Sequence, residues 1–534
     1  MDAHATHDPH HHDGRRVEDQ RLITGAGKYA ADWNVPGQLY GYFVRSDHAH
    51  AEIVSVNTTK ALAHPGVKQV YTGEDAVAAG YVRAAHVLAA PGKNGMKARA
   101  LDRPVLAHGK VRFVGEAVAL VVADSAGVAA DAAELVEVEY RELQPIVNPE
   151  QALAPGAPQL DVAVPGNLVY ESEAGNEAAT DAAIKSAAHV TRLRVDSTRV
   201  TPCPMEPRAC LVQYDPATGE YRFNLCTQGI TTLRKMMSSW TKVAEDKLIF
   251  EAHDVGGGFG QRTPAYPEYI ALMIAAKALV LADWSGFAAR RAQSAKAGKL
   301  RGLGISTVIE ASGAGNAPKD EVEMQLDASG TVTLYTVSKA QGHGHETTLG
   351  AIVANVLGLA LEKVKVVLCA PGSKLEGKFG STFPNGCHIT EVEIDKETGA
   401  PQIVSYCAVD DCGVIINHAI VEGQLHGGVV QGAGQVFGEQ VVYDQKSGQP
   451  LSASFMDYIM PRAGLVPELR GEEHATTSKV SPLGVKGVGE SGCTASIPSL
   501  VSAVLDAVRP VGVKHLDMPM TPSRIWRAMQ AVKR

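Results

Sequence analysis

The sequence is short of aromatic residues, of net basic charge and of paired cysteine motifs, and each shortage excludes a class of protein. Only 5% of the 534 residues are aromatic, and 50 basic residues against 58 acidic ones leave a net charge of −8. A chain with no basic excess is not expected to bind a nucleic-acid backbone. The eight cysteines form no C-x-x-C pair, which excludes a zinc ribbon, an iron–sulfur binding run and a disulfide scaffold. We therefore expect a cytoplasmic protein with reduced thiols.

Long hydrophobic runs are missing as well. The longest run, residues 269–282, is interrupted by Lys277 and is shorter than the roughly 20 apolar residues that span a bilayer. The first residues carry no charged-then-apolar signal pattern. Residues 1–20 are instead polar and rich in histidine, which predicts a disordered leader, with adventitious metal binding as the alternative. No membrane span is expected.

Glycine is plentiful, with 53 residues, and four short turns share one pattern of aspartate and glycine. In each turn an aspartate opens the connection and a glycine closes it, between runs of strand-like residues. Aspartate and glycine in these positions are typical of a tight hairpin. The four turns are residues 215–219, 327–330, 395–399 and 444–448. Much of the sheet structure is therefore predicted to be antiparallel, which favours an α+β fold.

A second pattern, a glycine-rich loop followed by a helix, occurs three times. The loops are residues 255–260 (VGGGFG), 338–345 (SKAQGHGH) and 483–492 (LGVKGVGESG), and convincing strands precede only the first two. The helices are expected from about Pro267, from about Glu346, and after the third loop, where Pro498 suits the first turn. Because backbone N–H groups in such loops can approach an anion closely, three of them together indicate a large phosphate-bearing ligand.

Common nucleotide and hydrolase motifs do not account for these loops. The third loop satisfies G-x-G-x-x-G through Gly487, Gly489 and Gly492 but follows no apolar strand, so a nicotinamide-binding domain is disfavoured. Neither G-x-x-x-x-G-K-[ST] nor G-x-S-x-G occurs. His343 and His345 could form a metal pair, but without H-E-x-x-H they are interpreted as hydrogen-bond donors at a helix start.

Glu490 is the one acidic residue of the third loop and has two interpretations. It lies between Gly489 and Ser491, just before a helix with a buried apolar stripe. A carboxylate desolvated there would have a raised pKa and could act as a base. Alternatively, Glu490 caps the helix that follows. The local sequence does not decide between these two roles.

Taken together, the motifs resemble those of a known family, the molybdopterin-binding large subunits of molybdenum hydroxylases, which include xanthine dehydrogenase and aldehyde oxidase. The chain is most similar to bacterial three-subunit members, including the carbon monoxide dehydrogenase large chain, and the resemblance runs nearly end to end. Residues 16–33 and 43–51 resemble the start of the family's N-terminal hammerhead domain. The motifs that follow in the family's order are PMEPRACLV, CTQG, DVGGGFG, AQGHGHETT, AVDDCGVIINHAIVEGQLHGGVVQG, SFMDYIMPR and KGVGESG.

The resemblance assigns roles to loop residues by their position in these motifs. Gln228 resembles the glutamine beside the molybdenum, and no side chain is expected to ligate the metal directly. His343 stands where the family's pterin-binding loop Q-G-Q-G-H has its second glutamine. Glu490 matches the catalytic glutamate. The remaining cofactor-binding candidates are Gly257, Gly258, Phe259, Gly260, Gln341, Gly342, Gly344, Gly487 and Gly489.

The resemblance also implies an activity, a cofactor and partners. Glu490 would be the general base in the hydroxylation of an aldehyde or N-heterocyclic carbon with oxygen derived from water. The cofactor would be molybdenum–molybdopterin in its cytosine dinucleotide form. Electrons would leave to a small iron–sulfur subunit and a medium FAD subunit, because this chain has a motif for neither group. The carbon monoxide branch needs a copper-binding cysteine on a loop that this chain omits, so that activity is not expected.

At two positions, called joints below, the chain departs from the family pattern. After residue 279, and again after VKVVLCAPGS, longer family segments that shape the substrate pocket are absent, so the chain looks internally shortened. The predicted organisation is a disordered leader (1–20), a hammerhead-like domain (21–150), and the first (165–280) and second (281–534) parts of a molybdopterin-binding domain. The alternative to an enzyme is a shortened, non-catalytic remnant that keeps its interfaces or cofactor affinity.

Overall fold

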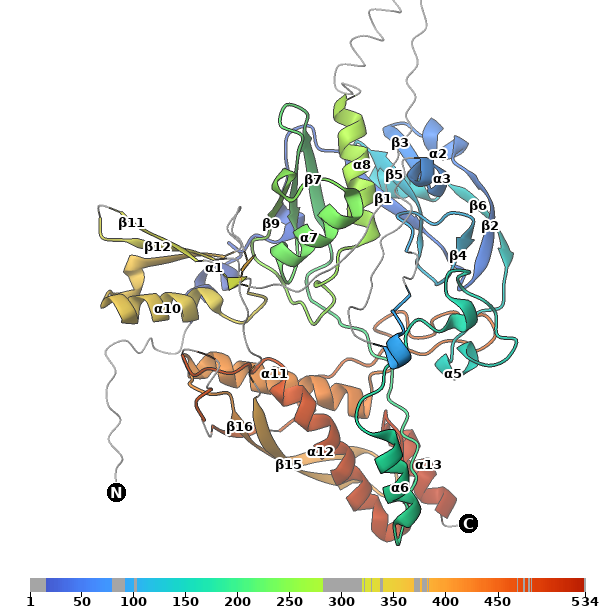
Figure 1. The fold of residues 1–534 in the computed structure, drawn as a ribbon, viewed down its shortest axis with the longest axis vertical. Helices are drawn as coiled ribbons and strands as arrows, with labels where there is room; N and C mark the ends of the chain where they lie inside the picture. The colour runs from blue at the N-terminus through green and yellow to red at the C-terminus, as the bar shows by residue number, and fades with distance from the viewer. Residues whose placement is uncertain are drawn as a thin grey trace, which may run out of the picture.

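A computed structural model of the chain describes residues 16–78, 92–99, 103–281, 319–320, 322–327, 329–336, 340–368, 375–376, 382, 384–467, 469–473, 476–478, 481 and 483–532. The arrangement of its parts is seen in Figure 1: most blue and green elements form the upper part, α10 with its strands lies at the left, and α11 to α13 lie below, with the green helix α6 beside α12 and α13. The first joint, near residues 279–281, lies at the end of a described range, and most of the joint after residue 373 lies outside the described residues.

The N-terminal part contains two antiparallel three-stranded sheets, ordered β1-β5-β3 and β4-β2-β6. Strand β5 reads AVALVVA, and all seven of its residues are buried because it lies between two partner strands and under helix α4. The strands are β1 (Tyr40–Arg45), β2 (Ala51–Asn57), β3 (Val67–Thr72), β4 (Lys110–Val111), β5 (Ala117–Ala123) and β6 (Glu137–Glu142). The helices up to the next sheet are α1 (Asp19–Ile23), α2 (Thr59–Ala63), α3 (Gly73–Ala78), α4 (Ala126–Ala133), α5 (Pro149–Ala152) and α6 (Glu177–Ser186).

The rest of the chain repeats one unit three times: an antiparallel hairpin, a crossover helix, and a third strand that pairs in parallel with the second. The first unit is β7 (Cys210–Asp215), β8 (Glu220–Leu225), α7 (Ile230–Thr241) and β9 (Leu248–Glu251). The second is β11 (Glu323–Leu326), β12 (Val332–Thr336), α10 (His345–Leu357) and β13 (Val364–Leu368). The third is β15 (Asn385–Ile394), β16 (Pro401–Asp411), α11 (His418–Phe437) and β17 (Leu469–Glu473).

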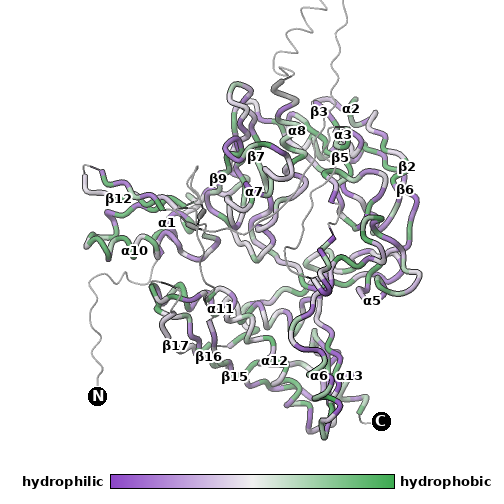
Figure 2. Tube along the Cα trace, in the orientation of Figure 1, coloured by the Kyte–Doolittle hydropathy of each residue, from purple (hydrophilic) through white to green (hydrophobic). Residues whose placement is uncertain are grey.

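Further elements complete the units. Helix α8 (Pro267–Leu281) follows the first unit, a short pair β10 (Lys319–Asp320) and β14 (Leu375–Glu376) accompanies the second, and α12 (Ser491–Val508) and α13 (Pro522–Val532) follow the third. One apolar core lies around Phe223, Trp240 and Phe250, and another lies between α11, α12 and the β15–β16 hairpin. In Figure 2, hydrophobic residues recur along α10 and α12 between hydrophilic ones.

The α+β prediction and the four predicted turns are confirmed. The glycines that close the turns, Gly219, Gly330, Gly399 and Gly448, all have φ between +71° and +77°. At the fourth turn, the flanking chains are joined by a single bridge between Tyr443 and Pro450 and form no full strands. Each hairpin aspartate accepts hydrogen bonds that lower its pKa: Asp327 chiefly from the Ser329 hydroxyl, and the other three chiefly from backbone N–H groups within their turns. The parallel pairing of each third strand was not predicted.

Two local predictions differ from the structure. Helix α12 begins at Ser491, so Pro498 lies inside it, in its third turn. Residues 16–20, assigned to the disordered leader, are held by specific contacts: the Arg16 guanidinium pairs with Asp19, and Val17 N donates to Thr347 Oγ1 over 3.0 Å. Residues 1–15 lie outside the described part.

Residues 491–511 form the one segment among the described helices that is long and apolar enough to cross a membrane. This segment packs against α11 and β15 and carries the buried side chains of Leu500, Val504 and Val508. These contacts are typical of a helix in the core of a folded domain.

Candidate cofactor site

In each repeated unit, a predicted loop follows a strand of the parallel pair. The carboxyl ends of parallel strands lie at one edge of a sheet, where open α/β sheets bind their ligands. In the first unit, Gln228 follows β8 and the 255–260 loop follows β9. In the second unit, the 341–344 loop follows β12. In the third unit, the loop that ends at Glu490 follows β17.

Gln228 and Gly258 are in direct contact. A Cβ added to Gly258 would lie 2.6 Å from Gln228 Cδ, so only glycine allows this approach. The Gln228 side chain is itself held, because its Oε1 accepts from Arg262 N over 3.1 Å while Gln228 N donates to Arg262 O over 3.1 Å. The sequence prediction that these two residues share a site agrees with this geometry.

Two buried charged residues that the sequence analysis did not single out hold the first loop. Glu206 accepts hydrogen bonds from Gly256 N over 2.9 Å and from Ala30 N over 3.1 Å. Arg262, only 3% exposed, donates to the Glu206 carbonyl and to the Cys226 thiol. Glu206 lies in the PMEPRACLV motif, so the signal for it was present in the sequence. Together they fix the position of the first loop.

The backbone of the first loop is unusual at three of its predicted site residues, Gly257, Phe259 and Gly260. Gly257 and Gly260 have φ of +101° and +80°, which favour glycine. Phe259 has φ of +48°, an uncommon value for a residue with a side chain, and its ring is 60% exposed. Such a conformation in a bulky residue costs on the order of 1–3 kcal/mol and is typical of functional sites.

The second loop presents an unpaired histidine nitrogen. Gly342 and Gly344 have φ of +104° and +64°, and a Cβ on Gly344 would clash with Ile420 of α11 at 2.3 Å. His343 stacks on His345 with ring centroids 5.1 Å apart. Burial lowers the pKa of His343, which favours the neutral ring, and its buried Nδ1 has no hydrogen-bond partner. A polar ligand group could satisfy this nitrogen.

Arg21 joins the first and second loops. Its guanidinium donates to Asp254, the residue before the 255–260 loop, over 2.8 Å, and to Glu346, at the start of α10, over 2.7 and 2.9 Å. These two carboxylates raise the pKa of Arg21. Asp254 also accepts from Lys28 N over 2.8 Å. The N-terminal segment therefore fixes the spacing between two loops that are far apart in the sequence.

The third loop is anchored at its base and open at its tip. Lys486 donates to Asp411 Oδ2 over 2.6 Å, across the same edge of the sheet, and Gly487 N donates to Thr382 Oγ1 over 3.3 Å. Glu490 is exposed, so the predicted desolvation of its carboxylate is not found. It stands at the N-cap of α12 but makes no side-chain capping bond, so the alternative role as a cap is not found either.

The loops are connected through α11. Gly344 of the second loop lies against Ile420, which is in the first turn of α11. Helix α12 packs against α11 so closely that Gly428 of α11 approaches the backbone of Gly492 of α12. Among the described residues, no hydrogen bond links Glu490 to the first or second loop. Ser491 Oγ is buried without a partner next to Glu490. The two unpaired atoms, His343 Nδ1 and Ser491 Oγ, fit a polar cofactor between the loops.

Direct protein ligands to a metal are not evident in this part of the chain. Within the described residues, no group of three or more His, Cys, Asp and Glu side chains could hold a metal ion. The seven described cysteines are free thiols, and Cys369 lies outside the described residues.

Comparison with known proteins defines the class. Residues 24–144 match the aldehyde oxidase and xanthine dehydrogenase a/b hammerhead domain, and residues 161–282, 277–370 and 370–467 match molybdopterin cofactor-binding domains. The chain therefore belongs to the molybdenum-containing oxidoreductases of the xanthine dehydrogenase and aldehyde oxidase family, as a large molybdopterin-binding subunit.

Individual relatives are similar over almost the whole chain. The nicotine 6-hydroxylase large subunit of Paenarthrobacter nicotinovorans is 25% identical over 97% of this chain and 94% of its own. The carbon monoxide dehydrogenase large chain of Hydrogenophaga pseudoflava is 25% identical over 96% of both chains. Among solved structures, quinoline 2-oxidoreductase from Pseudomonas putida 86 has a TM-score of 0.79 at 23% identity, covering 96% of this chain and 97% of its own. At that identity, the structural likeness shows the fold.

The comparison also bears on the two joints. The alignment with the nicotine 6-hydroxylase subunit spans 778 positions, which exceed the 534 residues of this chain by 244. The chain is therefore internally shortened relative to this protein while keeping both ends of the match. Because the matches cover the hammerhead and both cofactor-binding parts, they do not favour the alternative of a non-catalytic remnant.

Proposed function

We propose that this chain is the catalytic large subunit of a hydroxylase that oxidises an aldehyde or N-heterocyclic carbon with oxygen derived from water. The observation that supports this most is that Arg21 bonds Asp254 and Glu346, which stand next to the glycine loops 255–260 and 341–344, and so holds the two loops together. When bound, the molybdenum cofactor supplies a two-electron acceptor and activates the water-derived oxygen.

In this proposal each loop has a distinct task. Gln228 and the backbone of Gly257, Gly258, Phe259 and Gly260 face the metal end of the cofactor. The second loop, Gln341, Gly342, His343 and Gly344, binds the pterin, and the neutral His343 offers the unpaired Nδ1 as a hydrogen-bonding group. Gly487 and Gly489 have no side chains, so the backbone of the third loop can approach the cofactor closely. The Glu490 carboxylate makes no capping bond and is left to accept a proton as the general base.

We further propose the cytosine dinucleotide form of the cofactor, and a small iron–sulfur and a medium FAD subunit as partners in the cytoplasm. Carbon monoxide dehydrogenase large chains are among the similar proteins, which supports a multi-subunit assembly. The domain division is proposed as 21–150, 165–280 and 281–534. Substrate identity is left open because the shortened joints are those expected to shape the pocket.

Metal and pterin analysis of the purified chain tests the cofactor. Produced in a host that makes the molybdenum cofactor, the chain should carry molybdenum and pterin in equal amounts. A chain that is folded but contains neither would refute the proposed function.

The variant Glu490→Gln tests the base. Loss of a general base costs typically 10²–10⁴-fold in rate, so we expect turnover to fall by that factor while molybdenum content is unchanged. The matched control is Glu422→Gln, an exposed carboxylate on α11 that pairs with His426, which should keep full activity. Wild-type turnover by the Glu490 variant would remove Glu490 from the mechanism.

A further inference from the structure

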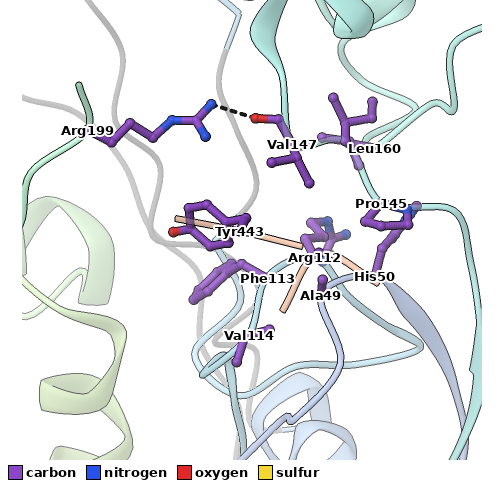
Figure 3. Close-up of a pocket in the computed structure, with 12 residues that line it drawn as sticks. Ala49, His50, Arg112, Phe113, Val114, Pro145, Val147, Leu160, Arg199 and Tyr443 are labelled. Carbon is purple, nitrogen blue, oxygen red and sulfur yellow. Dashed lines mark hydrogen bonds between the residues drawn. The ribbon is translucent and has the colours of Figure 1, made fainter. Parts of the chain in front are cut away.

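Outside the glycine loops, the chain has a hollow region and a buried polar network in different places. The hollow region is a cavity of about 210 Å³ between the hammerhead domain and the 443–450 turn, where Arg199 donates to Val147 O over 2.6 Å (Figure 3). The unpaired polar atoms beside it, His50 Nε2 and Arg112 Nε, are fully buried and do not face a ligand there. The network that bears on the proposed function lies instead between β15, β16 and α12, in the lower part of Figure 1.

Three buried polar side chains of the β15–β16 hairpin form this network beneath α12, and we call them the buried triad: Asp410, His388 and Tyr406. His388 Nε2 is 3.0 Å from Asp410 Oδ2, and His388 Nδ1 is 2.7 Å from the Tyr406 hydroxyl oxygen. All three side chains are buried. Because a carboxylate only accepts hydrogen bonds, Nε2 carries a proton and donates it to Asp410, and in a neutral ring Nδ1 accepts from the Tyr406 hydroxyl.

Two serine hydroxyls join α12 to this network. Ser496 is fully buried, and its hydroxyl and that of Thr390 hydrogen-bond the Tyr406 hydroxyl. Ser499 Oγ is 2.5 Å from Thr390 Oγ1 of β15. A Cβ on Gly432 of α11 would lie 1.9 Å from Ser496 Oγ, so glycine leaves room for this hydroxyl between the two helices. Helix α12 is therefore fixed to the sheet at two positions about one turn apart.

The two serines lie on either side of Pro498, which is inside the helix. Proline has no N–H, so the helix lacks the hydrogen bond that residue 498 would donate to the Thr494 carbonyl, and the ring crowds the preceding turn. The first turns of α12, which begin at Ser491, are therefore joined less firmly to the rest of the helix. The contacts of Ser496 and Ser499 with the sheet compensate for this weakness.

Glu490 stands between two anchors that start from neighbouring aspartates of β16. Lys486, four residues before Glu490, donates to Asp411 over 2.6 Å. Asp410 anchors Ser496, six residues after Glu490, through the rest of the buried triad. The backbone on both sides of Glu490 is therefore fixed to the same end of one strand, although the Glu490 side chain itself is exposed.

We propose that the buried triad positions the proposed base: it fixes α12 against the sheet and so sets where the Glu490 carboxylate stands relative to the first and second loops. Asp410, His388 and Tyr406 are positioning residues, which act through the helix and not on the substrate. The proposal rests on the function proposed above, because it takes Glu490 as the general base.

Tyr406→Phe tests this role, because it removes one hydroxyl and keeps the ring. A misplacement of about 1 Å can cost about 100-fold in rate, so we expect kcat of the assembled complex to fall by about ten- to hundredfold, with KM and molybdenum content unchanged. Ser496→Ala removes the other hydroxyl of the contact and should act in the same way. Ser502→Ala, at an exposed position of the same helix, is the matched control and should keep full activity.

The double variant Tyr406→Phe/Glu490→Gln separates positioning from other effects. If the buried triad acts through Glu490, no base is left to misplace, and the added substitution should change the residual turnover of Glu490→Gln by less than about twofold. A further fall by the full factor would overturn the proposal. Wild-type turnover by Glu490→Gln alone would instead refute the base itself, so the two failures are distinct.

Hydrogen exchange followed by mass spectrometry tests the anchoring without any turnover. In Tyr406→Phe, the amides of residues 491–497 should exchange about two- to tenfold faster than in wild type, the effect of one lost hydrogen bond, while those of α7 should not change. Exchange of residues 491–497 at the wild-type rate would contradict the anchoring and overturn the proposal. Where Tyr406→Phe does not fold, Ser496→Ala leaves the buried triad intact and gives the same comparison.

Discussion

At the scale of single residues, Arg21 carries the clearest structural role. Its planar guanidinium bonds Asp254 and Glu346 at the same time, which a lysine ammonium cannot match. We expect Arg21→Lys to lower the free energy of unfolding by about 1–2 kcal/mol, since the pairs are partly exposed. It should also reduce the molybdenum retained per chain severalfold. Urea denaturation and metal analysis measure the two effects.

The control for Arg21 is an ion pair that holds no loop. Arg141→Lys alters the exposed pair with Glu52 on the hammerhead sheet, and should change stability by less than about 0.5 kcal/mol. Equal loss of molybdenum in both variants would contradict a specific role for Arg21.

The buried pair of Asp411 and Lys486 gives a prediction about pH. Lys486 Nζ, together with hydrogen bonds from Thr476 and from Gly413 N, lowers the pKa of Asp411. A carboxyl with a lowered pKa stabilises the fold above its unfolded pKa of about 3.9, and this contribution is lost as pH falls further. Asp411→Asn should therefore destabilise the chain most near neutral pH, and its difference from wild type should shrink below about pH 4.

Urea midpoints measured for both proteins across this pH range test the Asp411 prediction. The hairpin aspartates also have lowered pKa values, so wild type will lose stability in acid regardless. A difference between the two proteins that stays constant with pH would disprove the prediction.

At the scale of elements, the contact between α11 and α12 places Glu490. A Cβ on Gly492 would lie 2.4 Å from the Leu425 carbonyl oxygen, and backbone cannot move aside as a side chain can. Gly492→Ala should cost about 1–3 kcal/mol, the usual price of overpacking. Gly427→Ala on the exposed face of α11 meets no atom within 4 Å and should instead stabilise by about 0.5–1 kcal/mol. Thermal unfolding of both variants tests the opposite signs.

Secondary-structure elements could be predicted from the sequence where neighbouring residues encode them. The hairpin turns are encoded by neighbouring residues such as Asp215 and Gly219, so their chemistry is readable from the sequence. The start of α12 was not placed correctly because a proline such as Pro498 suits a first turn by itself, while packing against α11 extends the helix back to Ser491. Parallel pairing of β9, β13 and β17 depends on crossovers of many residues, which local patterns do not specify.

At the scale of the whole molecule, the proposed partners give a spectroscopic prediction. If electrons leave to iron–sulfur and FAD subunits, the tagged chain purified from its native host should bring down two smaller chains that contain iron and flavin. Substrate should then bleach the flavin absorbance of the complex. The Glu490→Gln complex is the control, with the same flavin and no bleaching. Recovery of the chain alone, loaded with molybdenum and active, would contradict the need for partners.

The site as a whole was predictable only in part. The motifs identified Gln228, Gly258 and Glu490 by resemblance, but the residues that hold them act across long stretches of sequence. Arg262 and Glu206 were not found because a buried charge looks like any other charge until its contacts are known. The exposure of Glu490 was missed because an apolar stripe after a residue says nothing about the residue itself.

The clamp at Arg21 also sets an order of events during synthesis. Glu346 is 325 residues downstream of Arg21, and at about 5–20 residues per second it emerges roughly 15–65 seconds later. Until Glu346 emerges, Arg21 can bond only Asp254, and the first and second loops cannot take their final spacing. Contacts this distant in sequence form late in folding. We therefore expect cofactor insertion to be a late step, which acts on a chain whose hammerhead domain has already been made.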